Sequence, residues 1–326
     1  MCYNQPSMFP KLFIRILTIF LMISLGALAR RLGFTTPETS RRLARLTVSF
    51  FYPSLIFYSI FTNYTWAEII GNWSLPAGAF MIMSLGYLAG LIFSHLLPFD
   101  SKIQRAGFQF QCTINNYSFL PLPIALMLWG NPGMARLLFS TLGSEIAVWT
   151  LGILALAGTR LNRQSWRFLL NPPLLALLVT VLAVAFRDPL VRTIPAGGFT
   201  LLKEVGHSLL TVLDMFGRAT IPLSMFVAGS RMADLKPAHL FTRVQFYVVT
   251  LRLVAIPAVC IALLMALPLL PDIRSTLVLL ATMPSAIASV ALSEIFDGDP
   301  EFAASSVLLT HFVSLLTIPA WLAFLV

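Results

Sequence analysis

The sequence predicts an all-α membrane protein with ten transmembrane helices, arranged as two inverted five-helix repeats. The first observation is composition: of 326 residues, 58% are hydrophobic and only 11% are charged, and the mean hydropathy is +0.85. Soluble domains carry roughly 25% charged residues, so soluble, disordered and disulfide-scaffold classes are excluded. Long stretches without charge and a recurring pattern of helix-breaking residues are the other two observations.

Charged residues are absent from seven stretches of the chain. Each stretch has at least the ~18 residues that a membrane-spanning helix needs, and the stretches cover residues 46–67, 69–99, 106–135, 168–186, 253–271, 275–293 and 302–326. Together with the other apolar runs they predict ten spans, at approximately residues 10–30, 43–62, 74–97, 106–129, 135–157, 168–186, 203–230, 240–266, 274–295 and 303–326.

Lysine and arginine residues indicate the orientation of these spans. Thirteen fall in loops 1, 3, 5 and 7, seven fall on the opposite side, and Arg218 and Arg252 fall inside spans. Because loops rich in Lys and Arg stay in the cytoplasm, we expect both termini outside, on the periplasmic side of a bacterial inner membrane. The net charge of +9 comes largely from these short loops, so it reflects topology in the lipid bilayer and does not indicate nucleic-acid binding.

A pattern of prolines recurs between the two halves of the chain. Pro53 in the second span has a counterpart at Pro222 in the seventh, 169 residues later. The fourth span has Pro121 and Pro123, and the ninth has Pro284, 163 and 161 residues later. These offsets predict repeats at residues 1–160 and 161–326. Since five is an odd number of spans, the second repeat crosses the membrane in the opposite sense, which is typical of secondary transporters.

The fourth span carries the most polar chemistry. Asn115 and Asn116 lie near its centre, where an amide without a hydrogen-bond partner is costly. Pro121 and Pro123 follow and remove helix hydrogen bonds, and non-helical backbone at that depth must be buried in protein or line a cavity. We therefore expect a broken helix that offers amides and peptide dipoles to a ligand. The alternative is that the two asparagines only hold neighbouring helices together.

The ninth span is predicted to break at the same depth. Pro284 lies at the middle of its charge-free stretch, and small residues that allow close approach, including Ser285 and Ser289, follow it. A simple proline kink with small-residue packing is the alternative. Paired with the fourth span, Pro284 favours a site formed where two broken helices cross.

Two ionisable residues occupy comparable places in the two repeats. Glu145 lies in the fifth span and His311 in the tenth, 166 residues later. An ionisable group in the membrane indicates function by default, so these two are candidates for carrying a coupling proton. Sodium would instead need several oxygen ligands, which Thr113, Ser289 and the two asparagines can supply. The alternative is that Glu145 and His311 only stabilise neighbouring helices.

Two arginines lie within predicted spans. Asp214 and Arg218 are four residues apart, so they share a helix face and can form an ion pair. Alternatively Arg218 turns into the cavity, where its planar guanidinium suits a carboxylate. For Arg252 we expect a structural partner, with Asp214 as the candidate.

The motifs resemble those of the auxin efflux carrier family. The fourth span has the family's asparagine and proline, and Met283-Pro284 opens the ninth motif. The remaining matches are Gly298-Asp299-Pro300-Glu301, Ala303-Ala304-Ser305, Asn171-Pro172-Pro173, Pro53, Pro222 and Arg252-Leu253. The resemblance covers essentially the whole chain. It departs at Tyr117, where many members have a glycine.

This resemblance implies a fold like that of the PIN carriers and bile acid sodium symporters. In such proteins two crossing broken helices mark the transport site between a scaffold and a core domain, and relatives form homodimers. Their substrates are mostly organic anions. Together with the local chemistry, it implies a substrate site at Asn115, Asn116, Tyr117, Pro121, Pro284 and Ser285, and Arg218 of the seventh span is a further candidate on its own chemistry.

A secondary carrier of a small organic anion is therefore the expected function, by alternating access. Alternatives are a sodium-coupled symporter of the bile acid type and a channel. An enzyme is not expected, because no HExxH or GxSxG motif and no aspartate dyad occurs, and the P-loop of ATP-driven transport is absent. Three scattered cysteines at no metal-ligand spacing predict no metal site or cofactor, beyond a coupling proton or sodium ion.

Overall fold

The computed structural model describes residues 8–157, 171–193, 200–234 and 242–325. In this part of the chain the structure is entirely helical, without strands. Its α-helices are α1 (Met8–Arg31), α2 (Pro37–Leu46), α3 (Tyr52–Asn63), α4 (Trp66–Gly71), α5 (Ser74–Leu96), α6 (Lys102–Thr113), α7 (Pro121–Ala147), α8 (Ile153–Ala157), α9 (Pro172–Thr193), α10 (Thr200–Arg218), α11 (Thr220–Met232), α12 (Arg243–Thr250), α13 (Ile256–Ala266), α14 (Pro271–Ala281), α15 (Ser289–Ile295) and α16 (Pro300–Leu325).

Short π-helical turns join some of these helices into longer rods. They occupy Thr47–Phe51 between α2 and α3, Val148–Gly152 between α7 and α8, and Leu251–Ala255 between α12 and α13. Such turns often occur at functional sites. The third of them contains Arg252, whose contacts are central to the site described below.

Hydroxyl side chains cap the N-termini of several helices. Thr36, Ser101 and Thr242 each accept a hydrogen bond from a backbone N–H in the first turn of the helix that follows. Thr65 and Glu68 form a reciprocal capping box at the start of α4. Because these caps satisfy backbone N–H groups that the helix leaves unpaired, they fix where α2, α4, α6 and α12 begin.

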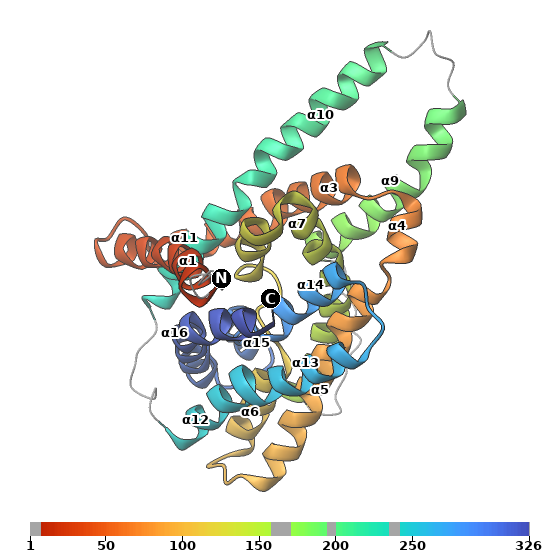
Figure 1. The fold of residues 1–326 in the computed structure, drawn as a ribbon. Helices are drawn as coiled ribbons and strands as arrows, with labels where there is room; N and C mark the ends of the chain where they lie inside the picture. Colours follow the sequence, from red (N-terminus) through yellow and green to blue (C-terminus); the bar gives the residue numbers. More distant parts are fainter. Residues whose placement is uncertain (1–7, 158–170, 194–199, 235–241, 326) are drawn as a thin grey trace, which may run out of the picture.

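The helices pack side by side in two groups (Figure 1). One group contains α1 against α11, and α3 against α9 and α10. The other contains α5 against α6 and α7, α12 against α16, and α13 against α14. Contacts of α1 with α16 and of α3 with α7 join the groups. The boundary predicted between residues 160 and 161 lies outside the described residues.

A sharp bend at Gly130 divides α7. Its φ angle of 63° lies in the left-handed region, which glycine adopts without steric cost. Pro132 follows, and its ring disfavours a continuous helix. The bend falls between residues 129 and 135, where the sequence predicts the end of the fourth span and the start of the fifth.

Seven helices of the described chain are long and apolar enough to cross a membrane. They are Phe9–Arg31, Pro37–Asn63, Trp66–Leu96, Pro121–Leu156, Glu204–Met232, Arg243–Ala266 and Pro300–Ala323. The prediction of an all-helical membrane protein is confirmed, whereas ten spans remain a prediction. The numbers differ partly because α6, α14 and α15 have only 12, 11 and 7 residues. Each of these three helices borders an interruption.

Candidate functional site

Two interruptions of helical structure lie against each other in the interior of the protein. The first, residues 114–120, separates α6 from α7, and the second, residues 282–288, separates α14 from α15. Asn115 and Ser285 pair as an isolated antiparallel β-bridge. The Asn116 N–H donates to the Pro284 carbonyl over 2.7 Å, and the Ala286 N–H donates to the Ile114 carbonyl over 3.2 Å. Each segment thus satisfies backbone groups that the other lost on leaving the helix.

The sequence explains why the chain leaves the helix at these points. Pro121 is the first residue of α7, a position where a missing N–H costs nothing. Pro284 lies inside the second segment, so its carbonyl can accept while its nitrogen has nothing to donate. Gly86 of α5 lets the end of α6 come close, because a Cβ there would lie 2.5 Å from the Cys112 carbonyl oxygen. These residues shape the backbone of the site.

Arg252 joins both interruptions. It is fully buried, and its guanidinium donates to the Met283 carbonyl over 3.0 Å, the Cys112 carbonyl over 3.0 Å and the Ala281 carbonyl over 3.3 Å. Carbonyls at helix C-termini carry partial negative charge, and a cation among them is stabilised. The expectation that Arg252 pairs with Asp214 is wrong, since Asp214 binds Arg218 instead.

The two asparagines of the first segment point to different neighbours. The Asn115 amide nitrogen donates to the Leu280 carbonyl over 2.6 Å. The Asn116 amide nitrogen lies 3.0 Å from Nε2 of His311, whose Nδ1 lies 2.8 Å from the Val307 carbonyl. Both contacts are satisfied if the neutral imidazole carries its proton on Nδ1. His311 is therefore in direct contact with the segment, as a coupling role requires.

Glu145 contacts the same segment through Tyr117. Its carboxylate accepts from the Tyr117 hydroxyl over 2.8 Å, from the Asn171 amide over 2.9 Å and from the Trp149 indole N–H over 3.1 Å. An ionised carboxylate only accepts hydrogen bonds, so three donors suit it. Tyr117, the position where the chain departs from the resembled family, thus holds Glu145. His311 and Glu145 are thus each hydrogen-bonded to the first interruption, His311 to Asn116 and Glu145 to Tyr117.

Several buried polar atoms at the pairing have no protein partner in the described chain. They are Oδ1 of Asn115, Oγ of Ser289 and both side-chain polar atoms of Gln111. Ser285, by contrast, donates to the Gln111 carbonyl over 3.2 Å, and Thr113 donates to the Gln109 carbonyl of its own helix over 2.7 Å. Buried polar groups almost always have a partner. The unpaired amide and hydroxyl groups are therefore the ones that a bound ligand or water would satisfy.

Comparison with known proteins places these features in a family. Residues 11–164 and 159–322 match the family described as membrane transport protein. The chain belongs to the auxin efflux carrier family. The resemblance that the motifs indicated is thereby confirmed, and this member is a membrane transporter.

Two archaeal relatives of this auxin efflux carrier family member are similar along nearly their full length. An uncharacterised transporter of Methanocaldococcus jannaschii is 26% identical over 94% of this chain and 96% of its own. An uncharacterised transporter of Methanothermobacter thermautotrophicus is also 26% identical, with the same coverage. Neither name states a substrate.

Most of the predicted site residues meet at the paired interruptions of this transporter. Asn115, Asn116, Pro284 and Ser285 lie in the pairing itself, Pro121 and Ser289 begin the helices that leave it, and Thr113 ends α6. Tyr117, Glu145 and His311 adjoin it through hydrogen bonds. Arg218 is not brought to the site, because its guanidinium is bound to Asp214 and its side chain is 72% exposed. Within the described residues, no group of three His, Cys, Asp or Glu side chains is placed to hold a metal.

Sequence reasoning missed Gln111 and named the wrong partner for Arg252. Gln111 lies four residues before Asn115, a spacing that places both on one face of a helix. That spacing was a signal in the sequence. Arg252 was marked by its charge within a span, but its partners gave no signal, because they are the backbone carbonyls of Met283, Cys112 and Ala281.

Proposed function

We propose that this family member is a secondary active transporter that moves a small organic anion by alternating access. The substrate would bind where residues 114–120 and 282–288 pair. One observation carries the proposal: the side-chain oxygen Oδ1 of Asn115, the Gln111 side-chain amide and the Ser289 hydroxyl are buried at the pairing without a protein partner in the described chain. A carrier needs such a site, because it must bind a polar solute at a depth that lipid alone would exclude.

The proposed architecture is ten spans in two inverted repeats. It is supported by the common form of α6–α7 and α14–α15, in which a short helix, an unwound segment and a second helix follow each other. The group with α1, α3 and α9–α11 would be the scaffold, and the group with the paired interruptions would be the moving core. As implied by the family, the scaffold would also form a homodimer within the lipid bilayer.

An anion fits the electrostatics around the pairing. The N-terminus of α7 follows the first segment directly, and helix N-termini carry partial positive charge. Arg252 adds a full positive charge behind both segments. The Gln111 amide nitrogen is a donor without a partner. A small carboxylate matches this set because it carries one negative charge and several acceptor positions.

A proton is the coupling ion that the local contacts favour. Glu145 and His311 both touch the first segment, so a change in their charge acts directly on the site. Carbonyl oxygens of Cys112, Ala281 and Met283, which are of the kind that sodium prefers, already bind Arg252. Sodium coupling of the bile acid type remains the alternative for the experiment to exclude.

Uptake into proteoliposomes tests the proposal. A panel of radiolabelled mono- and dicarboxylates would be offered with a proton gradient, a sodium gradient or neither. We expect at least one carboxylate to accumulate, and Asn115→Ala and Asn116→Ala to abolish its uptake while expression and monodispersity stay normal. Asn63→Ala is the matched control, because the Asn63 side-chain amide donates to the Ser59 carbonyl and the Thr62 hydroxyl of its own helix. Normal transport by both site variants would contradict the site.

A further inference from the structure

A groove of about 340 Å³ lies between α1 and α16, beside the end of α11. The helices α1 and α16 pack side by side (Figure 1). Most of the groove's lining is apolar and comes from Phe20, Ile23, Ala27, Met232, Leu308 and Phe312. Phe312 is 73% exposed, and a large apolar side chain exposed on a membrane-spanning helix faces lipid. This α1–α16 groove therefore opens toward the hydrocarbon of the bilayer.

One face of α1 forms one wall of the groove. Phe20, Ser24, Ala27 and Arg31 line it and follow each other at intervals of four, three and four residues, which places them in a row along one face of the helix. The Ser24 hydroxyl donates to the Phe20 carbonyl over 2.9 Å, so it presents no unpaired donor to the groove. The row is thus largely apolar and ends in a positive charge.

The groove has the length of one leaflet of a bilayer. Phe20 lies halfway along the span Phe9–Arg31, and the chain from Phe20 to Arg31 rises about 16 Å as an α-helix. Half of the ~30 Å hydrocarbon core is about 15 Å. Arg31 borders loop 1 of the predicted topology, where Lys and Arg are abundant and the cytoplasm is expected. The groove therefore extends from the middle of the membrane to its cytoplasmic surface.

Arg31 supplies the charge of the groove. No other Lys, Arg, Asp or Glu is among the described residues that line it. The Arg31 guanidinium forms no hydrogen bond or ion pair within the described chain, whereas the neighbouring Arg30 is bound to Asp234. His311 also lines the groove, but both of its ring nitrogens already have partners. The groove thus carries one unmatched positive charge at its cytoplasmic end.

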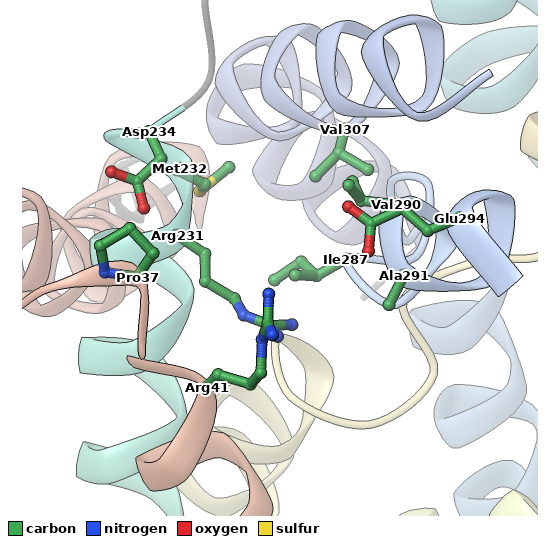
Figure 2. Close-up of a pocket in the computed structure, with 10 residues that line it drawn as sticks. All are labelled: Pro37, Arg41, Arg231, Met232, Asp234, Ile287, Val290, Ala291, Glu294 and Val307. Carbon is green, nitrogen blue, oxygen red and sulfur yellow. The ribbon is translucent and has the colours of Figure 1, made fainter. Parts of the chain in front are cut away.

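The adjoining cavity has a different character (Figure 2). It measures about 200 Å³, lies between α2, α11, α15 and α16, and shares Met232 with the groove. Figure 2 shows Arg41 and Arg231 on one side of this cavity and Glu294 on the other. An acyl chain placed there would remove water from charges of both signs, which is costly. The α1–α16 groove has its charge only at one end, so it is the one that suits an amphipathic molecule.

We propose that the α1–α16 groove binds one anionic phospholipid of the cytoplasmic leaflet, such as phosphatidylglycerol. The lipid phosphate would pair with Arg31, and one acyl chain would lie between Phe20 and Ala27 of α1 and Phe312 of α16. In the proposed architecture α1 belongs to the scaffold and α16 to the core, so the bound lipid would stand between the two, next to His311. Lipid binding here is independent of which solute the protein transports.

Thermal unfolding of the purified full chain in detergent tests the proposal. Dioleoyl phosphatidylglycerol would be compared with dioleoyl phosphatidylcholine, because a lipid that binds the folded state raises the unfolding temperature. We expect phosphatidylglycerol to reach its half-maximal effect at a concentration about five-fold lower, which corresponds to the ~1 kcal/mol that one arginine contributes at a membrane surface. Arg31→Gln should remove this preference.

Two matched controls separate the groove from general effects of charge and size. Arg45→Gln takes the same charge from the end of α2, outside the groove, and should change the preference less than about two-fold. Ser24→Trp fills the groove and should abolish stabilisation by phosphatidylglycerol. Thr18→Trp should retain it, because Thr18 lies on α1 outside the groove and, like Ser24, bonds the carbonyl four residues earlier.

A conservative variant guards against loss of folding as the explanation. Arg31→Lys keeps the charge, so its preference for phosphatidylglycerol should stay within about two-fold of the wild type. Equal stabilisation of the wild type by both lipids, or a wild-type response in both Arg31→Gln and Ser24→Trp, would overturn the proposal. So would equal stabilisation by glycerol 3-phosphate, which has no acyl chain, or stronger stabilisation by oleate, because the occupant would then be a free anion or a fatty acid.

Discussion

Arg252 and the Arg41–Arg231 pair present the same side chain in two contrasting environments. Arg252 is fully buried and donates to three carbonyls at the interrupted helices. Arg41 and Arg231 line a cavity that also holds Glu294, whose negative charge attracts the Arg231 guanidinium. A buried charge is tolerated only when protein groups compensate it, whereas a charge in a cavity can keep its binding capacity for a solute. The first arginine thus holds the site together, whereas the other two line a cavity at the second interruption.

Arg252→Gln should show the largest effect. The shorter neutral side chain cannot reach all three carbonyls, and each buried acceptor left without a partner costs about 1–3 kcal/mol. We expect a strong drop in the unfolding temperature and in the yield of monodisperse protein, measured by fluorescence-detected size-exclusion chromatography after heating. An unfolding temperature equal to that of the wild type would contradict a structural role for Arg252.

Arg252→Lys sharpens the same comparison with a smaller effect. Lysine keeps the positive charge but presents a compact ammonium group in place of the planar fork. We expect an unfolding temperature between those of the wild type and Arg252→Gln. If lysine restores full stability, charge alone explains the role of Arg252, and the geometry of its three contacts does not matter.

Glu145→Gln should change coupling with less effect on stability than Arg252→Gln. Glutamine keeps the shape of glutamate but cannot take up or release a proton in the relevant range. Uptake by the wild type should follow the proton gradient, whereas the variant should lose its pH dependence and keep exchange of substrate across the membrane. A wild-type pH profile in the variant, together with equal stimulation of both proteins by sodium, would contradict proton coupling.

Arg231→Gln should have the smallest effect on stability. Its guanidinium has no hydrogen bond to lose, and the substitution removes repulsion from Arg41 together with attraction to Glu294. We expect an unfolding temperature equal to or slightly above that of the wild type when no anion is present. Destabilisation as large as that of Arg252→Gln would show that the two environments do not differ in the way the structure indicates.

The contrast also explains which parts of the site could be predicted from the sequence. The breaks in the fourth and ninth spans were predictable, because Asn115, Asn116, Pro121 and Pro284 act through local chemistry. Their pairing across 170 positions was expected only from the repeat and the family resemblance. The partners of Arg252 were not predictable, since backbone carbonyls leave no trace in the sequence. Arg41 and Arg231 were read only as topology charges, because their shared cavity depends on how α2 and α11 pack.

Equilibrium binding of the transported anion tests the central claim most directly, that the ligand sits where the two interruptions pair. The radiolabelled carboxylate identified by uptake would be titrated into purified wild type, Asn115→Ala and Asn63→Ala in detergent, where no gradient contributes. The account predicts that Asn115→Ala weakens binding by about ten-fold or more, as the loss of a buried polar contact implies, and that Asn63→Ala matches the wild type. Unchanged affinity in folded Asn115→Ala would contradict it.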